Sequence, residues 1–115
     1  MTKLENRARK NHKSGYNCSQ SVAIAYADKM VMTSEEARTL SPAPRSIAGK
    51  CGALLAAEMV LERLSIDKKD ELEKRFSDEN GAVECSKLRS PEIRKFRSCN
   101  DFVGSAARLL EEMIS

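Results

Sequence analysis

Apolar residues recur at the spacing of an α-helix along the segment 49–64. The residues that define this spacing are Ala53, Ala56, Ala57, Val60, Leu61 and Leu64. The segment 17–30 is apolar almost all round, which indicates a helix that is buried on most sides. No segment shows the sustained alternation of apolar and polar residues that is typical of a half-buried strand. Because short helices gain stability mainly by packing their apolar faces together, we expect an all-α fold, a compact bundle of four to five short helices.

A capping signal places a further short helix ahead of the segment 49–64. Thr33 is followed three residues later by Glu36, which is the capping-box pattern of a helix start. Pro42 cannot continue a helix, because it lacks a backbone N–H and its ring clashes with the preceding turn. The sequence therefore predicts a helix over 33–40.

The second half of the chain carries similar signals. A helix is expected to start at a capping Asp67 and to end at Gly81. Short turns are expected at 85–88 and after Pro91, since proline is favoured in the first turn of a helix. Apolar residues at helical spacing then predict a last amphipathic helix over 102–114.

The length of 115 residues fits one domain with its own core. Hydrophobic residues make up 41% of the chain and aromatic residues only 4%, so the core must be built mainly from aliphatic side chains. We expect a single helical domain over 15–115, preceded by a basic N-terminal arm over 1–14. This arm holds five basic residues against Glu5, and we interpret it as a helix with a solvated charged face.

Neither the N-terminal residues nor any other segment of the sequence indicates a membrane protein. The basic N-terminal residues are not followed by the apolar run of a secretory signal, so we expect a cytoplasmic protein. No stretch approaches the roughly 18 consecutive apolar residues that a membrane-spanning helix needs. Nucleic acid is also a disfavoured partner, because the basic residues come without stacking aromatic residues or a helix-turn-helix spacing.

The chain has four cysteines, more than its packing needs: Cys18, Cys51, Cys85 and Cys99. In a reducing compartment an even number of cysteines favours metal binding or redox chemistry over structural disulfides. None of the four belongs to a C-x-x-C pair, so a shared site would have to be assembled by the tertiary fold. Each cysteine lies near a predicted helix N-terminus, where N–H groups and the helix dipole stabilise a thiolate.

Basic residues are concentrated between the last two cysteines, where only Glu92 opposes them. They are Lys87, Arg89, Arg94, Lys95 and Arg97. Positive charge at this place would also favour a thiolate. Taken one by one, these residues and Lys50 are interpreted as ordinary surface charges.

The sequence does not contain the motifs of other common kinds of active site. His12 is the only histidine, and it lies in the charged arm, where we expect it to be solvated. Neither a phosphate-binding loop nor a dinucleotide-binding glycine pattern is present. We therefore assign no catalytic residue, and the four cysteines remain the candidates for a redox or metal site.

Four segments carry a resemblance to a known family: "GYNCSQSV", "GKCGALLAA", "AVECSKL" and "SCNDFV". Together they resemble the C-GCAxxG-C-C family of redox-active proteins, a small helical family named for its four cysteines. In this comparison Cys51, Gly52 and Ala53 supply the central Cys-Gly-Ala, and Gly49 lies just before it. The last glycine of the motif is replaced by Ala56, which should be tolerated if that position serves helix packing. The resemblance implies redox chemistry and names no substrate.

Three hypotheses remain open at this point. In the first, the four cysteines form an electron-transfer site that binds an iron–sulfur cluster or a thiophilic metal such as zinc. In the second, they carry out thiol–disulfide chemistry without a metal. Either function calls for a redox partner protein. In the third, the chain is a non-catalytic helical interaction domain that binds an acidic partner or nucleic acid through the arm 1–14.

Overall fold

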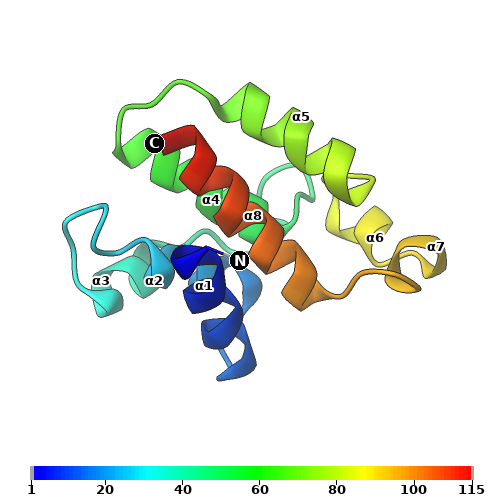
Figure 1. Ribbon diagram of the computed structural model, residues 1–115, viewed down its shortest axis with the longest axis horizontal. Helices are drawn as coiled ribbons and strands as arrows, with labels where there is room; N and C mark the ends of the chain where they lie inside the picture. The colour runs from blue at the N-terminus through cyan, green and yellow to red at the C-terminus, as the bar shows by residue number, and fades with distance from the viewer. Residues whose placement is uncertain (1, 115) are drawn as a thin grey trace.

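The computed structural model describes residues 2–114, so the predicted ends of the arm and the domain, Met1 and Ser115, lie outside the described residues. The described chain is a globule of eight helices without a strand (Figure 1). They are α1 (Lys3–Lys13), α2 (Cys18–Ala25), α3 (Ser34–Leu40), α4 (Gly52–Arg63), α5 (Lys69–Asn80), α6 (Cys85–Leu88), α7 (Pro91–Arg94) and α8 (Cys99–Ile114). The all-α prediction is confirmed, whereas the predicted number of four to five helices is wrong.

The additional helices come from segments that the sequence analysis did not count in the bundle. The arm forms α1, which begins after an N-cap at Thr2 whose hydroxyl accepts a hydrogen bond from the N–H of Glu5. The two segments expected as turns each close one helical turn of four residues, α6 and α7. Pro91 is the first residue of α7, as its missing N–H favours.

Several helix boundaries differ from the predicted ones. α2 ends at Ala25 rather than near residue 30, because the backbone leaves the helical region at Tyr26. α5 begins after Lys68, which has no side-chain cap, so the prediction that Asp67 caps this helix is wrong. Gly81 ends α5 with a left-handed φ of 97°, as expected of a glycine C-cap.

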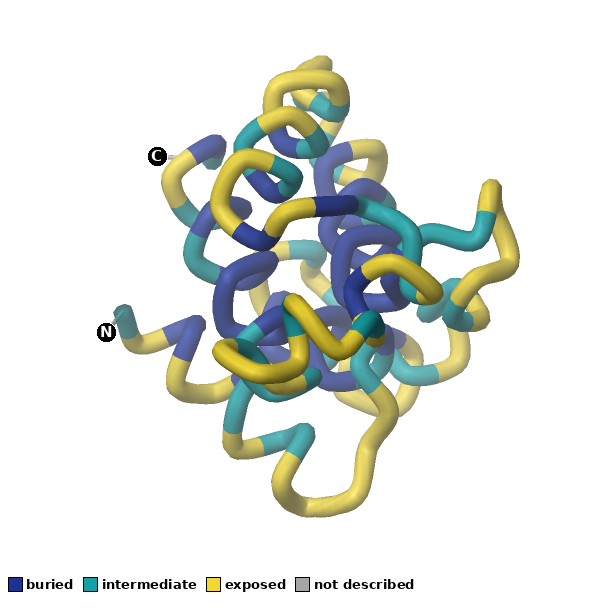
Figure 2. Tube along the Cα trace, turned by 90° about the vertical axis from the view of Figure 1, so that its right-hand side faces the viewer, coloured by how far each residue is buried: buried dark blue, intermediate teal, exposed yellow. Residues whose placement is uncertain are grey.

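Helix α4 lies at the centre of the fold and is buried over most of its length. It packs against α2, α5 and α8, while α1 packs against α2 and α8. Figure 2 shows the buried segments gathered in the middle of the molecule and the exposed turns around them. Within this core the hydroxyl of Tyr26 donates a hydrogen bond to the carbonyl oxygen of Ala107, at 2.7 Å. This bond ties the end of α2 to α8.

The basic arm is packed onto the rest of the molecule. Leu4 and Ala8 of α1 are buried in the core. Arg9 forms ion pairs with Glu5 and, across to α8, with Asp101, both at 3.1 Å. The other basic side chains of the arm remain exposed, as expected of a solvated helix face. One basic residue of the arm, Arg9, therefore forms an ion pair that holds α1 against α8.

One isolated antiparallel bridge joins Lys50 to Glu84, between the segments that lead into α4 and α6. Two backbone hydrogen bonds form it, from the N–H of Cys51 to the oxygen of Val83 and from the N–H of Cys85 to the oxygen of Gly49, each at 2.8 Å. The bridge thus fixes two helix starts side by side. In residues 2–114, no helix combines the length and the apolar character needed to cross a membrane.

Candidate functional site

All four cysteines stand at helix starts, as the sequence predicted. Cys18, Cys85 and Cys99 are the first residues of α2, α6 and α8, and Cys51 is the N-cap of α4. For α2 the local reason is a complete capping box between Asn17 and Gln20, which fixes where the helix begins. Each cysteine therefore lies in the part of its helix where backbone N–H groups have no partner within the helix.

The fold brings Cys18 and Cys51 into direct contact. The helices that carry them, α2 and α4, pack against each other, and the two thiol groups form a hydrogen bond. Cys51 is only 5% exposed, whereas Cys18 is partly exposed. The pair thus combines one partly exposed residue with one buried residue.

Gly52 makes the close approach of Cys18 to α4 possible. A Cβ atom at Gly52 would lie 2.6 Å from Cys18 Sγ and 3.0 Å from Cγ of Pro44. The space that a side chain would need is therefore filled by the sulfur and by the ring of Pro44. Because Gly52 has no side chain, Cys18 Sγ reaches the N–H groups of Gly52 and Ala53 at the start of α4.

The surroundings shift the pKa values of the two thiols in opposite directions. The hydrogen bond from Cys51, aided by the N–H groups of Ser19, Ala53 and Gly52, lowers the pKa of Cys18 to about 6. The same hydrogen bond, together with burial and the charge on Cys18, raises the pKa of Cys51. At neutral pH the pair therefore holds a Cys18 thiolate that accepts a hydrogen bond from a protonated Cys51.

Cys85 is held near this pair by the backbone. Its N–H donates to the oxygen of Gly49 in the bridge described above, two residues before Cys51. Gly49 has a φ of +68°, in the left-handed region that favours glycine, and it turns the chain into the bridge. The sequence-predicted residues Gly49, Gly52 and Ala53 thus all lie around the start of α4.

Cys99 has a different environment at the start of α8. Its Sγ accepts a hydrogen bond from Nη1 of Arg94, at 3.1 Å. Ser98 and Asp101 cap the helix reciprocally, with the N–H of Ser98 donating to Oδ2 of Asp101 at 2.8 Å. The sequence placed Arg94 among surface charges, and no local signal marks it as a partner of Cys99.

The described residues do not fit a resident metal in their present arrangement. In residues 2–114, no three His, Cys, Asp or Glu side chains are grouped so that they could hold one ion. A cluster or a zinc site would need more sulfur ligands at a common centre than the Cys18–Cys51 contact supplies. Binding of an iron–sulfur cluster or zinc stays a prediction, and we derive no step from it.

Ala56, which stands where the resemblance places the last glycine of the motif, lies at a packing position. The residue is fully buried on α4, within the hydrophobic core. It lies one helical turn beyond Gly52, the glycine that makes room for Cys18 Sγ. The small side chain of Ala56 is accommodated by the core.

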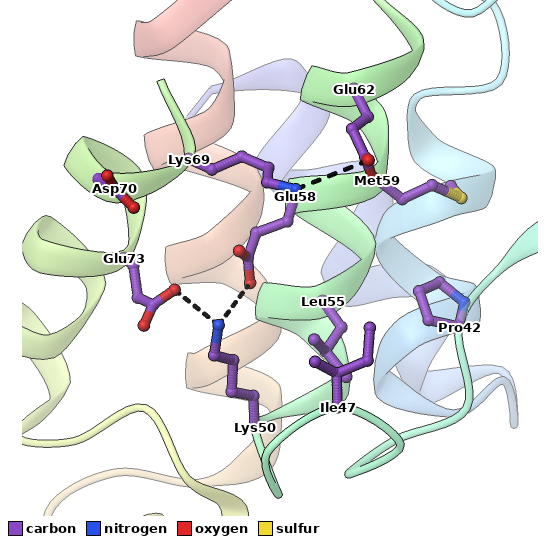
Figure 3. Close-up of a pocket in the computed structure, with 10 residues that line it drawn as sticks. All are labelled: Pro42, Ile47, Lys50, Leu55, Glu58, Met59, Glu62, Lys69, Asp70 and Glu73. Atoms are coloured by element: carbon purple, nitrogen blue, oxygen red, sulfur yellow. Dashed lines mark hydrogen bonds and ion pairs between the residues drawn. The ribbon is translucent and has the colours of Figure 1, made fainter. Parts of the chain in front are cut away.

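Lys50, next to Cys51, is part of an ion-pair network that the sequence analysis missed. Its Nζ lies 2.8 Å from Oε2 of Glu73 on α5 and 3.8 Å from Oε1 of Glu58 on α4 (Figure 3). The hydrogen bond to Glu73 raises the pKa of Lys50, and burial raises the pKa of Glu58. The network borders a pocket of about 350 Å³ and ties the segment before Cys51 to two helices.

Most of the chain matches the sequence model of a protein family. The sequence model of a family described as "Putative redox-active protein (C_GCAxxG_C_C)" matches residues 16–113. Comparison with curated proteins finds no match, and comparison with solved structures finds none. The family match covers nearly the whole chain and includes all four cysteines. The chain therefore belongs to the C_GCAxxG_C_C family, whose description is that of a redox-active protein.

Proposed function

We propose that the protein carries out thiol–disulfide exchange with Cys18 as the attacking thiolate and Cys51 as the resolving thiol. The observation that carries this proposal is the hydrogen-bonded Cys18–Cys51 pair at the start of α4, in which the more exposed residue, Cys18, has the lowered pKa. Exchange needs a thiolate that can reach a disulfide, and a second thiol within reach of the first. The pair supplies a thiolate at a partly exposed residue and a second thiol beside it.

The reaction oxidises the two thiols and reduces one disulfide of a partner. The Cys18 thiolate attacks one sulfur of the partner disulfide, the partner S–S bond breaks, and its second sulfur leaves as a thiolate. Cys51 then loses its proton and attacks Cys18 Sγ, which forms the Cys18–Cys51 disulfide and releases the other partner sulfur. The two partner thiols take up two protons, one released by Cys51 and one from solvent, and two electrons pass from the cysteine pair to the partner.

The pKa shift of Cys51 suits the second step. Its pKa is raised first by the hydrogen bond to Cys18, then by burial, and then by the charge of Cys18. The mixed disulfide removes the charge of Cys18, so two of these causes are weakened or lost. The N–H groups of Leu54 and Ala53 continue to favour the thiolate of Cys51. Cys51 is thus held protonated until the first step is complete.

The compartment predicted from the sequence fits this chemistry. In a cytoplasmic protein, reducing thiol systems would return the disulfide to the dithiol, so that the pair could act repeatedly. A redox partner protein is therefore part of the proposal. The third hypothesis, a domain that binds through its arm, is less favoured because α1 is packed on α8 through Arg9 and Asp101.

A redox titration of the full chain tests the proposal. The protein is equilibrated in mixtures of reduced and oxidised dithiothreitol, quenched in acid, alkylated, digested and mapped by mass spectrometry. We expect one two-electron transition that links Cys18 to Cys51. Four free thiols across the whole range, or a disulfide that leaves out either of these cysteines, would overturn the proposal.

Two variants sharpen this test. Cys51→Ser should stop the reaction at the mixed disulfide of Cys18, which is detected by its added mass. The double variant Cys85→Ser/Cys99→Ser asks whether the other two thiols take part in the first disulfide. Formation of the Cys18–Cys51 disulfide without them supports the proposal, and its loss in a folded double variant contradicts it.

A further inference from the structure

The helices α6 and α7 lie at one end of the molecule (Figure 1). Their segment of the sequence carries concentrated positive charge. Five basic residues and one acidic residue lie between Cys85 and Cys99, in a chain whose net charge is +3. Four of the basic side chains belong to exposed residues: Lys87, Arg89, Arg94 and Lys95. We refer to these four residues and Phe96 as the basic end.

The charge of the basic end is poorly balanced by neighbouring residues. Within residues 2–114, Arg89 and Lys95 have no carboxylate within ion-pair distance, and Arg94 donates to the sulfur of Cys99. Lys87 pairs with Glu84 at 3.0 Å, but its side chain is 68% exposed, so solvent weakens this pair. In contrast, Arg75 and Arg108, on α5 and α8, each pair with Glu112. The basic end therefore presents positive charge to solvent.

Phe96 adds an exposed aromatic ring to this charge. It is 79% exposed, whereas the other two phenylalanines, Phe76 and Phe102, are buried in the core. Nζ of Lys95 lies 5.8 Å from the centre of its ring. Ile93 anchors the segment by packing against the core, so the ring is presented by a fixed element. Aromatic and arginine side chains are the residue types that contribute most to protein interfaces.

The basic end is connected to the cysteine pair by the backbone. α6 follows the bridge in which Cys85 and Cys51 donate to Gly49 and Val83. A protein that covers α6 and α7 would therefore contact the element that is paired with the segment leading into Cys51. Docking at the basic end would place the partner next to the start of α4.

We propose that the basic end binds the acidic face of the protein that exchanges disulfides with Cys18, with Phe96 as an apolar anchor. This inference rests on the proposed function and specifies the chemistry of its partner. Opposite charge would bring the partner to this end of the molecule and raise the rate of encounter. A protein is favoured over nucleic acid because one exposed phenylalanine does not form a platform for stacked bases.

The test compares two synthetic peptides that contain the same internal disulfide, flanked by glutamates in one and by lysines in the other. The measured quantity is the ratio of their second-order rates with the reduced full chain. At low salt we expect the glutamate peptide to react about tenfold faster, and the difference to shrink at high salt. Equal rates at low salt, or a preference for the lysine peptide, would overturn the inference.

A charge-reversal variant locates the effect. Arg89→Glu/Lys95→Glu should abolish or invert the preference, whereas Arg7→Glu/Lys10→Glu makes the same change of charge on exposed positions of α1 and should keep it. Loss of the preference in both variants would contradict a docking site at the basic end. Because each variant is judged by the ratio of two rates, a general change in thiol reactivity cancels.

Two further arms separate the possible failures. A small neutral disulfide, hydroxyethyl disulfide, reports on exchange itself: if the wild-type pair does not react with it, the proposed function fails. If the wild-type pair reacts with hydroxyethyl disulfide but the protein shows no preference between the two peptides, only the docking inference fails. Binding of a labelled mixed-sequence single-stranded RNA that is lost in Arg89→Glu/Lys95→Glu, with no peptide preference in the wild type, would assign the basic end to nucleic acid and overturn the inference.

Discussion

Cys18 Sγ packs against the backbone of Gly52, in space that a side chain would need: a Cβ atom at Gly52 would lie 2.6 Å from this sulfur. The glycine belongs to α4 and the sulfur to α2, so this contact links the central helix to the reactive thiol. The lack of a side chain at Gly52, in the Cys-Gly-Ala motif, thus has a physical reason. It lets the thiolate reach N–H groups that a side chain would hold it away from.

The first prediction concerns this contact. Gly52→Ala should push Cys18 Sγ away from the start of α4 and raise the pKa of Cys18 by about one unit or more. Alkylation by iodoacetamide at pH 6.5 should then slow several-fold, since the thiolate is the reacting form. The pKa is measured from the thiolate absorbance at 240 nm during a pH titration.

Gly49→Ala is the matched control for this change. Gly49 lies on the other side of Cys51 and has a left-handed φ, and an added Cβ would meet no atom within 4 Å. This variant should therefore lose stability through backbone strain while it keeps the lowered pKa of Cys18. An unchanged pKa in Gly52→Ala, or the same rise in both variants, would contradict the role given to Gly52.

The second prediction concerns the hydrogen bond between the two thiols. Cys51→Ala removes the donor that is the largest cause of the lowered pKa of Cys18, so this pKa should rise by about one unit. Cys51→Ser keeps a hydroxyl donor and should raise the pKa less. Titration of both variants at 240 nm checks the order. A pKa that is equal in the two variants would show that the donor has no such effect.

Local features of the fold could be predicted from the sequence, because they depend on neighbouring residues. The capping box of Thr33 with Glu36 and the glycine end of α5 at Gly81 are both confirmed. Asp67 failed as a cap because α5 begins after Lys68, and a capping residue type alone does not fix the register. Helix boundaries set by tertiary packing, such as the early end of α2, carry no such signal.

The candidate site was predictable only in part, for the same reason. Helix starts at the four cysteines follow from local patterns, and the structure confirms them. The pairing of Cys18 with Cys51 depends on how α2 and α4 pack, and the ring of Pro44 reaches the site from a loop. Long intervals between the cysteines leave such contacts open, so the sequence could not choose between one shared site and separate ones.

The third prediction concerns the arm. Arg9→Met should lower the free energy of unfolding by about 2 kcal/mol, because it removes bonds to Glu5, Asn100 and Asp101 and leaves a buried carboxylate at Glu5. Arg7→Met, the control on the same helix, removes a 3.9 Å ion pair with an exposed Asp28 and should cost less than about 0.5 kcal/mol. Urea denaturation of both variants measures the difference. Equal losses would contradict a structural role for Arg9.

The fourth prediction is a pH dependence of the reduced protein. The pKa of Cys18 is about 6 in the folded chain and has its ordinary value of 9.0 in the unfolded chain. A lowered pKa stabilises the fold fully above the unfolded value, and this contribution is lost as the pH falls through the folded value. Between pH 6 and pH 8 the free energy of unfolding should therefore rise by on the order of 2 kcal/mol from this thiol. Urea denaturation with excess reductant measures it, and Cys18→Ser is the control, because a hydroxyl does not titrate in this range. A rise of equal size in Cys18→Ser would assign the pH dependence to other groups and contradict a thiolate at Cys18.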